Sequence, residues 1–157
     1  MNDIKSVTQD MIFFLKENVL MKDTYFDSGY VYEGRNLSPR KIIVTGKIGK
    51  AKIGDSSIGN CIGENLFGKA MELTLDFCIY CGRGRSGADC EEVFSKIVEA
   101  LMVKDKGLYI KEITAEKISY IKEAGVLQMP FKMSVDYYIT KENQTIAISD
   151  FLLRSGN

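Results

Sequence analysis

Two segments of the chain alternate without interruption between large apolar and polar side chains, and this feature constrains the fold more than any other. The apolar positions of the first segment are Met71, Leu73, Leu75, Phe77 and Ile79. Those of the second are Leu127, Met129, Phe131, Met133, Val135, Tyr137 and Ile139. Because successive side chains of a strand point to opposite faces, each segment predicts a long strand with one face on a core and the other exposed. Half-exposed strands are typical of antiparallel or mixed sheets, whereas the strands of a doubly wound α/β protein are apolar on both faces.

An amphipathic helix is predicted over 88–103, between the two strands. Ser86 can cap it, and Asp89 follows three residues later in a close variant of the capping box. Its apolar stripe consists of Cys90, Val93, Phe94, Ile97, Val98 and Leu101. A second amphipathic helix is predicted over 3–21, where apolar residues recur at helical spacing at Ile4, Val7, Met11, Phe14 and Leu15.

The segment from 22 to 68 predicts one or two strands joined by long loops. It contains eight glycines and Pro39, which favour turns, and short β-branched pieces at 41–45 and 50–53. Loops of this length inside a compact domain are usually functional or become ordered on assembly.

Shorter strands, or one bent strand, are predicted after the second helix, over 108–113 and 116–121, with a tight turn at 123–125 leading into the last long strand. Pro130 has no N–H group to donate to a neighbouring strand, so it predicts a sheet edge or a bulge near the beginning of that strand.

Together these elements predict an α+β fold with a mixed, mainly antiparallel sheet of about four to five strands and two helices packed on one face. The length of 157 residues fits a single domain over 1–157. The segment 141–157 carries several large apolar residues, among them Phe151 and Leu152, and these need a partner surface. It is therefore a candidate C-terminal docking arm.

The composition excludes several classes of function. The 21 basic and 21 acidic residues balance, so no bulk charge directs the chain to nucleic acid, and we expect no sequence-specific nucleic-acid partner. The sequence has no histidine, which excludes Ser-His and Cys-His nucleophile pairs and histidine metal sites. The first residues mix charges into their apolar positions and no segment is long enough to span a bilayer, so we expect a cytoplasmic protein without a membrane partner.

The four cysteines, Cys61, Cys78, Cys81 and Cys90, can be a redox pair, a zinc site or packing residues. A Cys₄ zinc site places its C-x-x-C pairs on turns, whereas the odd spacing of Cys78 and Cys81 on a strand sends their side chains to opposite faces. We therefore expect unpaired, reduced thiols and no metal.

Residues 82–87 read Gly-Arg-Gly-Arg-Ser-Gly, which is a literal G-x-G-x-x-G between a strand and a helix. A dinucleotide-binding fold also needs parallel strands buried on both faces, and the surrounding pattern predicts an antiparallel meander. We therefore interpret the glycines as a tight turn, and Arg83 and Arg85 as candidates for a contact with the carboxylates of a neighbouring subunit. A small nucleotide-binding enzyme that uses this loop is the alternative from a different functional class.

Lysines are frequent in the glycine-rich segment, at Lys41, Lys47, Lys50 and Lys52. Charged side chains on a strand edge prevent unwanted strand pairing, so a solvated edge accounts for them. In an assembly Lys50 and Lys52 become contact candidates, together with Phe151 and Leu152. No group of residues supplies a nucleophile, a base and oxyanion donors together, so we expect no enzymatic activity and no cofactor.

The order of these elements resembles that of the tail terminator, or tail completion, proteins of tailed phages and phage-like particles. The similar segments are MELTLDFCIYCGRGRSGADCEEVFSKIVEAL, a long strand leading through a polar loop into a helix, and GVLQMPFKMSVDYYI, a closing strand after a glycine turn. The resemblance covers residues 1 to 140 and is one of pattern and order.

The resemblance implies a structural subunit that assembles in the bacterial cytoplasm into a virion or phage-like particle. Such a subunit forms a hexameric ring on the tail tube, ends the polymerisation of the tube and contacts the neck or collar, and also the sheath in a contractile particle. The particle can be a phage, a bacteriocin or another contractile injection system. Another neck or baseplate subunit of the same particle is the nearest alternative.

Overall fold

The structure, a computed structural model, describes residues 4–28, 40–53, 60–63, 66–103 and 109–142, with the backbone alone described at 60–63, 66–70 and 138–142. Its elements are α1 (Ile4–Asn18), β1 (Thr24–Ser28), β2 (Ile42–Ile53), β3 (Asn60–Gly63), β4 (Leu66–Cys81), α2 (Gly87–Val103), β5 (Tyr109–Ala115), β6 (Ser119–Ile121) and β7 (Val126–Glu142). The sheet has the order β1-β2-β4-β7-β5, and the short strands β3 and β6 pair with β4 and β7.

The sheet is mixed and mainly antiparallel, as the sequence predicts. Strand β1 runs parallel to β2, and every other described pair is antiparallel. Because β4 and β5 are both antiparallel to β7, they are parallel to each other with β7 between them, and α2 connects them as in a split βαβ unit. The predicted α+β fold class is confirmed.

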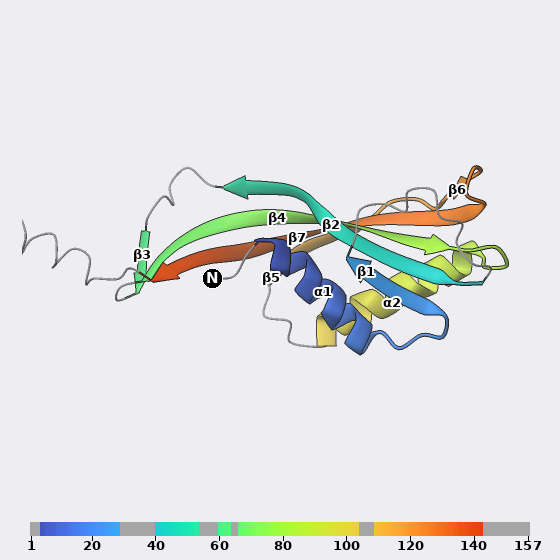
Figure 1. The fold of residues 1–157 in the computed structure, drawn as a ribbon, viewed down its shortest axis with the longest axis horizontal. Coiled ribbons are helices and arrows are strands. Elements are labelled where there is room, and N and C mark those ends of the chain that lie inside the picture. Colours follow the sequence, from blue (N-terminus) through green and yellow to red (C-terminus); the bar gives the residue numbers. More distant parts are fainter. Residues whose placement is uncertain (1–3, 29–39, 54–59, 64–65, 104–108, 143–157) are drawn as a thin grey trace, which may run out of the picture.

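Both helices lie on the same face of the sheet (Figure 1). Helix α1 contacts β1 and β2, helix α2 contacts β4 and β7, and the two helices touch each other. The opposite face, which we call the outer face, carries no helix in the described part of the chain. None of the described helices has the length and apolar character needed to cross a membrane.

The core lies between the helices and the inner face of the sheet. All five apolar side chains predicted to alternate along β4 are buried, and so are those of β7 from Met129 to Tyr137. Phe131 is at the centre, stacked on Phe77 with 5.0 Å between ring centroids and meeting Phe94 of α2 edge to face at 5.4 Å. The period-two alternation therefore identified the inner face correctly.

The segments 41–45 and 50–53, predicted as separate pieces, belong to the single strand β2. The two pieces are joined through a bulge, since the pairing with β4 shifts between Ile48 and Lys50. Gly49 lies at this bulge, and a Cβ atom there would overlap with the carboxylate of Asp76. The bulge thus needs glycine because of a close approach by a neighbouring side chain.

Pro130 lies inside the sheet, because β7 is flanked by β4 on one side and by β5 and β6 on the other. Its carbonyl accepts a hydrogen bond from the N–H of Glu116, at 2.8 Å, in the break between β5 and β6. In a strand the N–H and C=O of one residue point to the same side, so the missing donor faces this break and β4 loses no hydrogen bond. The edge interpretation of Pro130 is wrong, and the break explains why proline is accepted.

Replacing Phe131 by alanine should lower the free energy of unfolding by about 3 to 5 kcal/mol, because it empties the centre of the core. Urea unfolding followed by circular dichroism measures this loss. The matched control is Phe13→Ala, since Phe13 is 64% exposed on α1 and should change stability by less than about 0.5 kcal/mol. Equal losses from the two variants would contradict the placement of the core.

Candidate subunit interface

The arginine turn, residues 82–86, connects β4 to α2 and is fastened to the beginning of β2. The N–H of Arg40 donates to the carbonyl of Arg83 at 2.7 Å, and the N–H of Gly82 donates to the carbonyl of Lys41 at 2.9 Å. Gly84 has a φ of 85°, a left-handed conformation that glycine adopts without steric cost. The tight turn inferred from the glycines is therefore present, and its shape depends on a segment more than forty positions earlier in the chain.

Arg85 connects three segments of the subunit. Its Nε donates to the carbonyl of Arg40 at 2.7 Å, and its terminal nitrogens lie 3.7 Å from the carboxylate of Asp23 and 3.5 Å from that of Asp89. Asp23 and Arg40 both have left-handed backbone conformations, with φ of 58° and 63°, which are unfavourable for residues other than glycine. Arg85 contacts both residues, so it helps to hold the turns at which β1 and β2 begin.

Arg83 has a different environment, because its side chain is exposed and lies against the backbone of Gly125. Its guanidinium forms no ion pair with any residue that the structure describes, and the same is true of Arg40, whose side chain lies against Gly84. The charge of Arg85 is compensated by two carboxylates, whereas Arg83 and Arg40 have no carboxylate partner among the described residues. The two arginines that the sequence paired as interface candidates thus differ in their environment.

The first turn of α2 uses its own carboxylate as a cap. The N–H and the hydroxyl of Ser86 donate to Oδ2 of Asp89, at 2.6 and 3.2 Å, which forms the half of the predicted capping box that Asp89 supplies. The other half differs, because the Asp89 N–H donates to the carbonyl of Ser86. The hydrogen bond from the Ser86 N–H is the main reason why the pKa of Asp89 is lowered, and Arg85 adds to the effect. A bound phosphate would therefore meet a carboxylate at this helix terminus. The strands beside β4 are also antiparallel to it, unlike those of a dinucleotide-binding fold.

The outer face carries rows of charged side chains that face one another across the strands. Lys52, Glu72 and Asp136 form one such row in the register of β2, β4 and β7. The amine of Lys111 lies 2.8 Å from Glu72 and 3.7 Å from Asp136, and its hydrogen bond lowers the pKa of Glu72. Lys50, opposite Thr74, and Lys52 are both exposed and lie near enough to Glu72 to lower its pKa further. The two lysine candidates therefore belong to the outer face.

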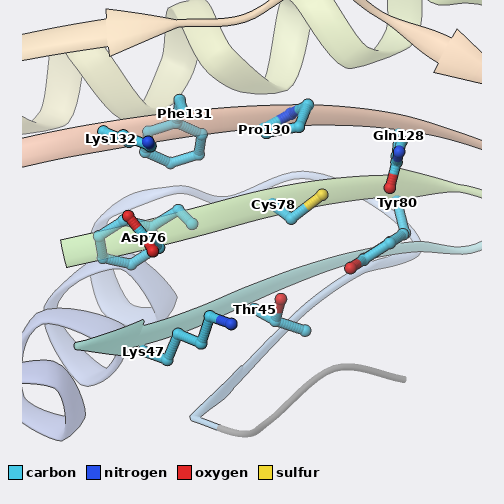
Figure 2. Close-up of a pocket in the computed structure, with 10 residues that line it drawn as sticks. Thr45, Lys47, Asp76, Cys78, Tyr80, Gln128, Pro130, Phe131 and Lys132 are labelled. Carbon is cyan, nitrogen blue, oxygen red and sulfur yellow. The ribbon is translucent and has the colours of Figure 1, made fainter. Parts of the chain in front are cut away.

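A groove of about 220 Å³ opens on the outer face across the three central strands. Figure 2 shows its side chains, with those of β4 in the middle and those of β2 and β7 on either side. The groove is lined by Thr45, Lys47, Asp76, Phe77, Cys78, Tyr80, Gln128, Pro130, Phe131 and Lys132. Its volume is below the roughly 300 to 1,000 Å³ of sites for drug-sized ligands and cofactors, so it fits a single side chain better than a nucleotide.

Asp76 is the unusual residue of the groove. The sheet register places it directly between Lys47 and Lys132, yet its buried Oδ1 atom has no hydrogen-bond partner among the described residues. The amine of Lys132 instead lies 3.9 Å from Glu116. An unsatisfied buried oxygen costs about 1 to 3 kcal/mol, and more when it is charged. No side chain in the described part of the chain therefore satisfies this oxygen.

The other polar side chains of the groove are held neutral. Burial raises the pKa of the Cys78 thiol to about 11 and also raises the pKa of the Tyr80 hydroxyl. Gln128 donates from Nε2 to the hydroxyl of Ser119 at 3.0 Å. Asp76 and the two lysines are thus the charged groups of the groove, and the residues around them provide neutral walls.

The remaining sequence candidates, Phe151, Leu152 and most of the docking arm 141–157, lie outside the described residues. No local pattern in the sequence points to Asp76, because its importance depends on the register of three strands and on the bulge at Gly49. The same is true of Asp23 and Arg40, since no local pattern predicts their left-handed conformations. No family model matches the chain, and no curated protein matches it significantly.

Replacing Arg85 by alanine should lower the free energy of unfolding by about 1 to 2 kcal/mol, since it removes a charged hydrogen bond and two partly exposed ion pairs. Arg83→Ala is the matched control and should leave stability unchanged within about 0.5 kcal/mol. Chemical denaturation of both variants measures the difference. A larger loss from Arg83→Ala than from Arg85→Ala would show that the roles are reversed.

The capping carboxylate also predicts a dependence of stability on pH. The pKa of Asp89 is lower in the folded chain than in the unfolded one, so its contribution is complete above the unfolded pKa of about 3.9 and is lost as the pH falls through the folded value. Asp89→Asn should therefore cost about 0.5 to 1 kcal/mol at neutral pH, the scale of a carboxylate in a first helical turn. This difference from the native chain should shrink as urea unfolding is repeated down to about pH 3. A difference that is constant with pH would rule out the ionised cap.

Proposed function

We propose that this chain is a structural subunit of a phage or phage-like tail. In this role it forms a ring on the end of the tail tube, stops the polymerisation of the tube and presents a surface to the neck, collar or sheath. The subunit has no catalytic activity and uses no cofactor. Its partners are further copies of itself, in a ring of six, and the tube protein.

The observation that carries the proposal of an assembly subunit is the groove on the outer face. Asp76 lies there with a buried carboxylate oxygen that has no donor in the described part of the subunit, on a face that no described helix covers. Buried carboxylate oxygens normally accept a hydrogen bond, so a donor from another protein chain would make this arrangement more favourable. The small volume of the groove fits one side chain of another protein chain.

A ring also needs two different surfaces on each subunit, because a head-to-tail contact joins unlike patches. The outer-face groove offers a carboxylate, and the arginine turn offers the exposed guanidinium of Arg83. These groups are complementary in charge and are of the type that forms charge-assisted hydrogen bonds across an interface. We therefore pair Asp76 of one subunit with Arg83 of the next.

The assignment to a tail terminator in particular comes from the resemblance in element order, which the α+β fold is compatible with. Another neck or baseplate subunit of the same particle would use the same two surfaces. The small nucleotide-binding enzyme is disfavoured by Asp89, whose carboxylate occupies the Ser86 N–H at the helix terminus where a pyrophosphate would bind.

Native mass spectrometry and negative-stain imaging of the purified chain test the proposal, together with the length of tubes grown from the tube protein of the same particle. We expect a closed ring of six, and shorter tubes when the chain is added. A chain that stays monomeric at high concentration and leaves tube length unchanged would refute the proposed function. Tight binding of NAD or ATP that depends on residues 82–87 would favour the enzyme.

The contact itself is tested by Asp76→Asn. This variant should weaken subunit association about tenfold or more, while its thermal midpoint stays the same or rises, because an unpaired buried charge is removed from the subunit. Arg83→Gln should weaken association similarly, and the double variant no more than either single one. Glu99→Gln, on the exposed side of α2, is the matched control and should change nothing. If the losses of association in the two single variants add up in the double variant, Asp76 and Arg83 do not contact each other. If Asp76→Asn leaves association unchanged, the groove is not part of the interface.

A further inference from the structure

Two cysteines from different elements meet in the core beside the arginine turn. Cys81 is the last residue of β4, and Cys90 lies in the first turn of α2. Both side chains are completely buried, and their sulfur atoms lie 2.7 Å apart, with one thiol hydrogen-bonded to the other. Cys78 belongs to the same strand but faces the outer groove, so it has no part in this contact.

We propose that Cys81 and Cys90 are a disulfide-forming pair, a covalent modification site that joins β4 to α2. A disulfide bond is about 2.0 Å long, so the two sulfurs need to approach by only about 0.7 Å. The backbone already holds them in place, since β4 is a central strand of the sheet and the capping box fixes the beginning of α2. The pair is independent of the function proposed above.

The chemistry needs an oxidant of the small-molecule disulfide class, such as oxidised glutathione. The hydrogen bond between the two thiols lowers the pKa of Cys90, and this bond together with burial raises the pKa of Cys81. Cys90 is therefore the first nucleophile, because the thiolate is the reactive form.

The exchange takes two steps. The Cys90 thiolate attacks one sulfur of the glutathione disulfide, which forms a mixed disulfide and releases one glutathione thiolate that takes up the Cys90 proton. Cys81 then loses its proton and attacks the sulfur of Cys90, so that the second glutathione leaves as a thiol. The protein gives up two electrons and two protons, and one glutathione disulfide becomes two thiols.

The bond would close a short loop that contains the whole arginine turn. Arg83 and Arg85 lie between the two cysteines. Oxidation would therefore reduce the number of conformations open to the arginine turn, both in the unfolded chain and in the folded protein. Because the sulfurs are buried, glutathione reaches them only when the first turn of α2 opens. We therefore expect slow oxidation that mild denaturant accelerates.

The experiment uses the full chain with Cys61→Ser and Cys78→Ser, which leaves the proposed pair as its thiols. The protein is incubated with oxidised glutathione, and the remaining thiols are alkylated before digestion with trypsin under non-reducing conditions. Trypsin cuts after Arg83 and Arg85, so it separates the two cysteines. The expected product is peptide 70–83 linked to peptide 86–96, at a mass two hydrogen atoms below the sum of the two, and dithiothreitol should release both.

Oxidation should also raise the thermal midpoint by about 5 °C or more, as expected for closure of a short loop. Cys81→Ala and Cys90→Ala should each abolish the linked peptide and this shift, and the chain with all four native cysteines should give the same link. The proposal is overturned if the folded protein yields no linked peptide, if it stops at the mixed disulfide, or if Cys78 forms the link in the native chain. In the native chain Cys78 and Cys81 share tryptic peptide 70–83, so fragmentation of the linked peptide by tandem mass spectrometry identifies which of them is joined to Cys90, even if an alanine variant does not fold.

Discussion

The long pairing of β4 with β7 is the constraint on which the rest of the structure depends. The two strands are antiparallel and in register without a break from Leu66 opposite Glu142 to Cys81 opposite Leu127. Since side chains alternate with a period of two, a slip by one residue would reverse the faces of the strand that moves, bringing Asp76 into the core and exposing Phe77 if β4 moves, or doing the same to Lys132 and Phe131 if β7 moves. The apolar positions of both strands oppose such a slip together, so the pairing fixes the inner face, the outer face and the position of the groove at once.

The same pairing explains which parts of the structure the sequence predicts. The inner face of β4 and β7, the stripe of α2 and the cap by Asp89 are local patterns. The inner face and the cap appear as expected, and of the predicted stripe only Phe94 and Val98 are half-buried and not fully buried. The groove is not local, because it needs Lys47, Asp76 and Lys132 to be opposite one another on three strands. The bulge at Gly49 is a further obstacle, since it changes which residues of β2 face outward in the second half of that strand. Alternation along one strand contains no information on either feature.

For the arginine turn, too, the sequence predicts the local conformation but not the contacts with distant residues. Its glycines predicted a tight turn, but the contacts of Arg85 with Asp23 and Arg40 join residues that are far apart in the sequence. The odd spacing of Cys78 and Cys81 correctly predicted that their side chains lie on opposite faces. It could not show that Cys81 would meet Cys90, because this contact depends on the direction in which α2 leaves the turn. In each case the local conformation was predictable and the partner was not.

The stability of the subunit and its proposed role place opposite demands on Asp76. Its buried oxygen has no donor among the residues that the structure describes, so an uncharged side chain of the same shape would suit this part of the fold better. Both flanking lysines are directly opposite Asp76 in the register, yet neither amine donates a hydrogen bond to this oxygen. Glu116 attracts Lys132 to the opposite side, towards the break at Pro130. The free-energy cost of the unsatisfied Asp76 oxygen therefore follows from the arrangement of the sheet. A cationic side chain from a neighbouring subunit would remove this cost. Burial of the outer face in an interface would then be more favourable than its polar composition alone suggests.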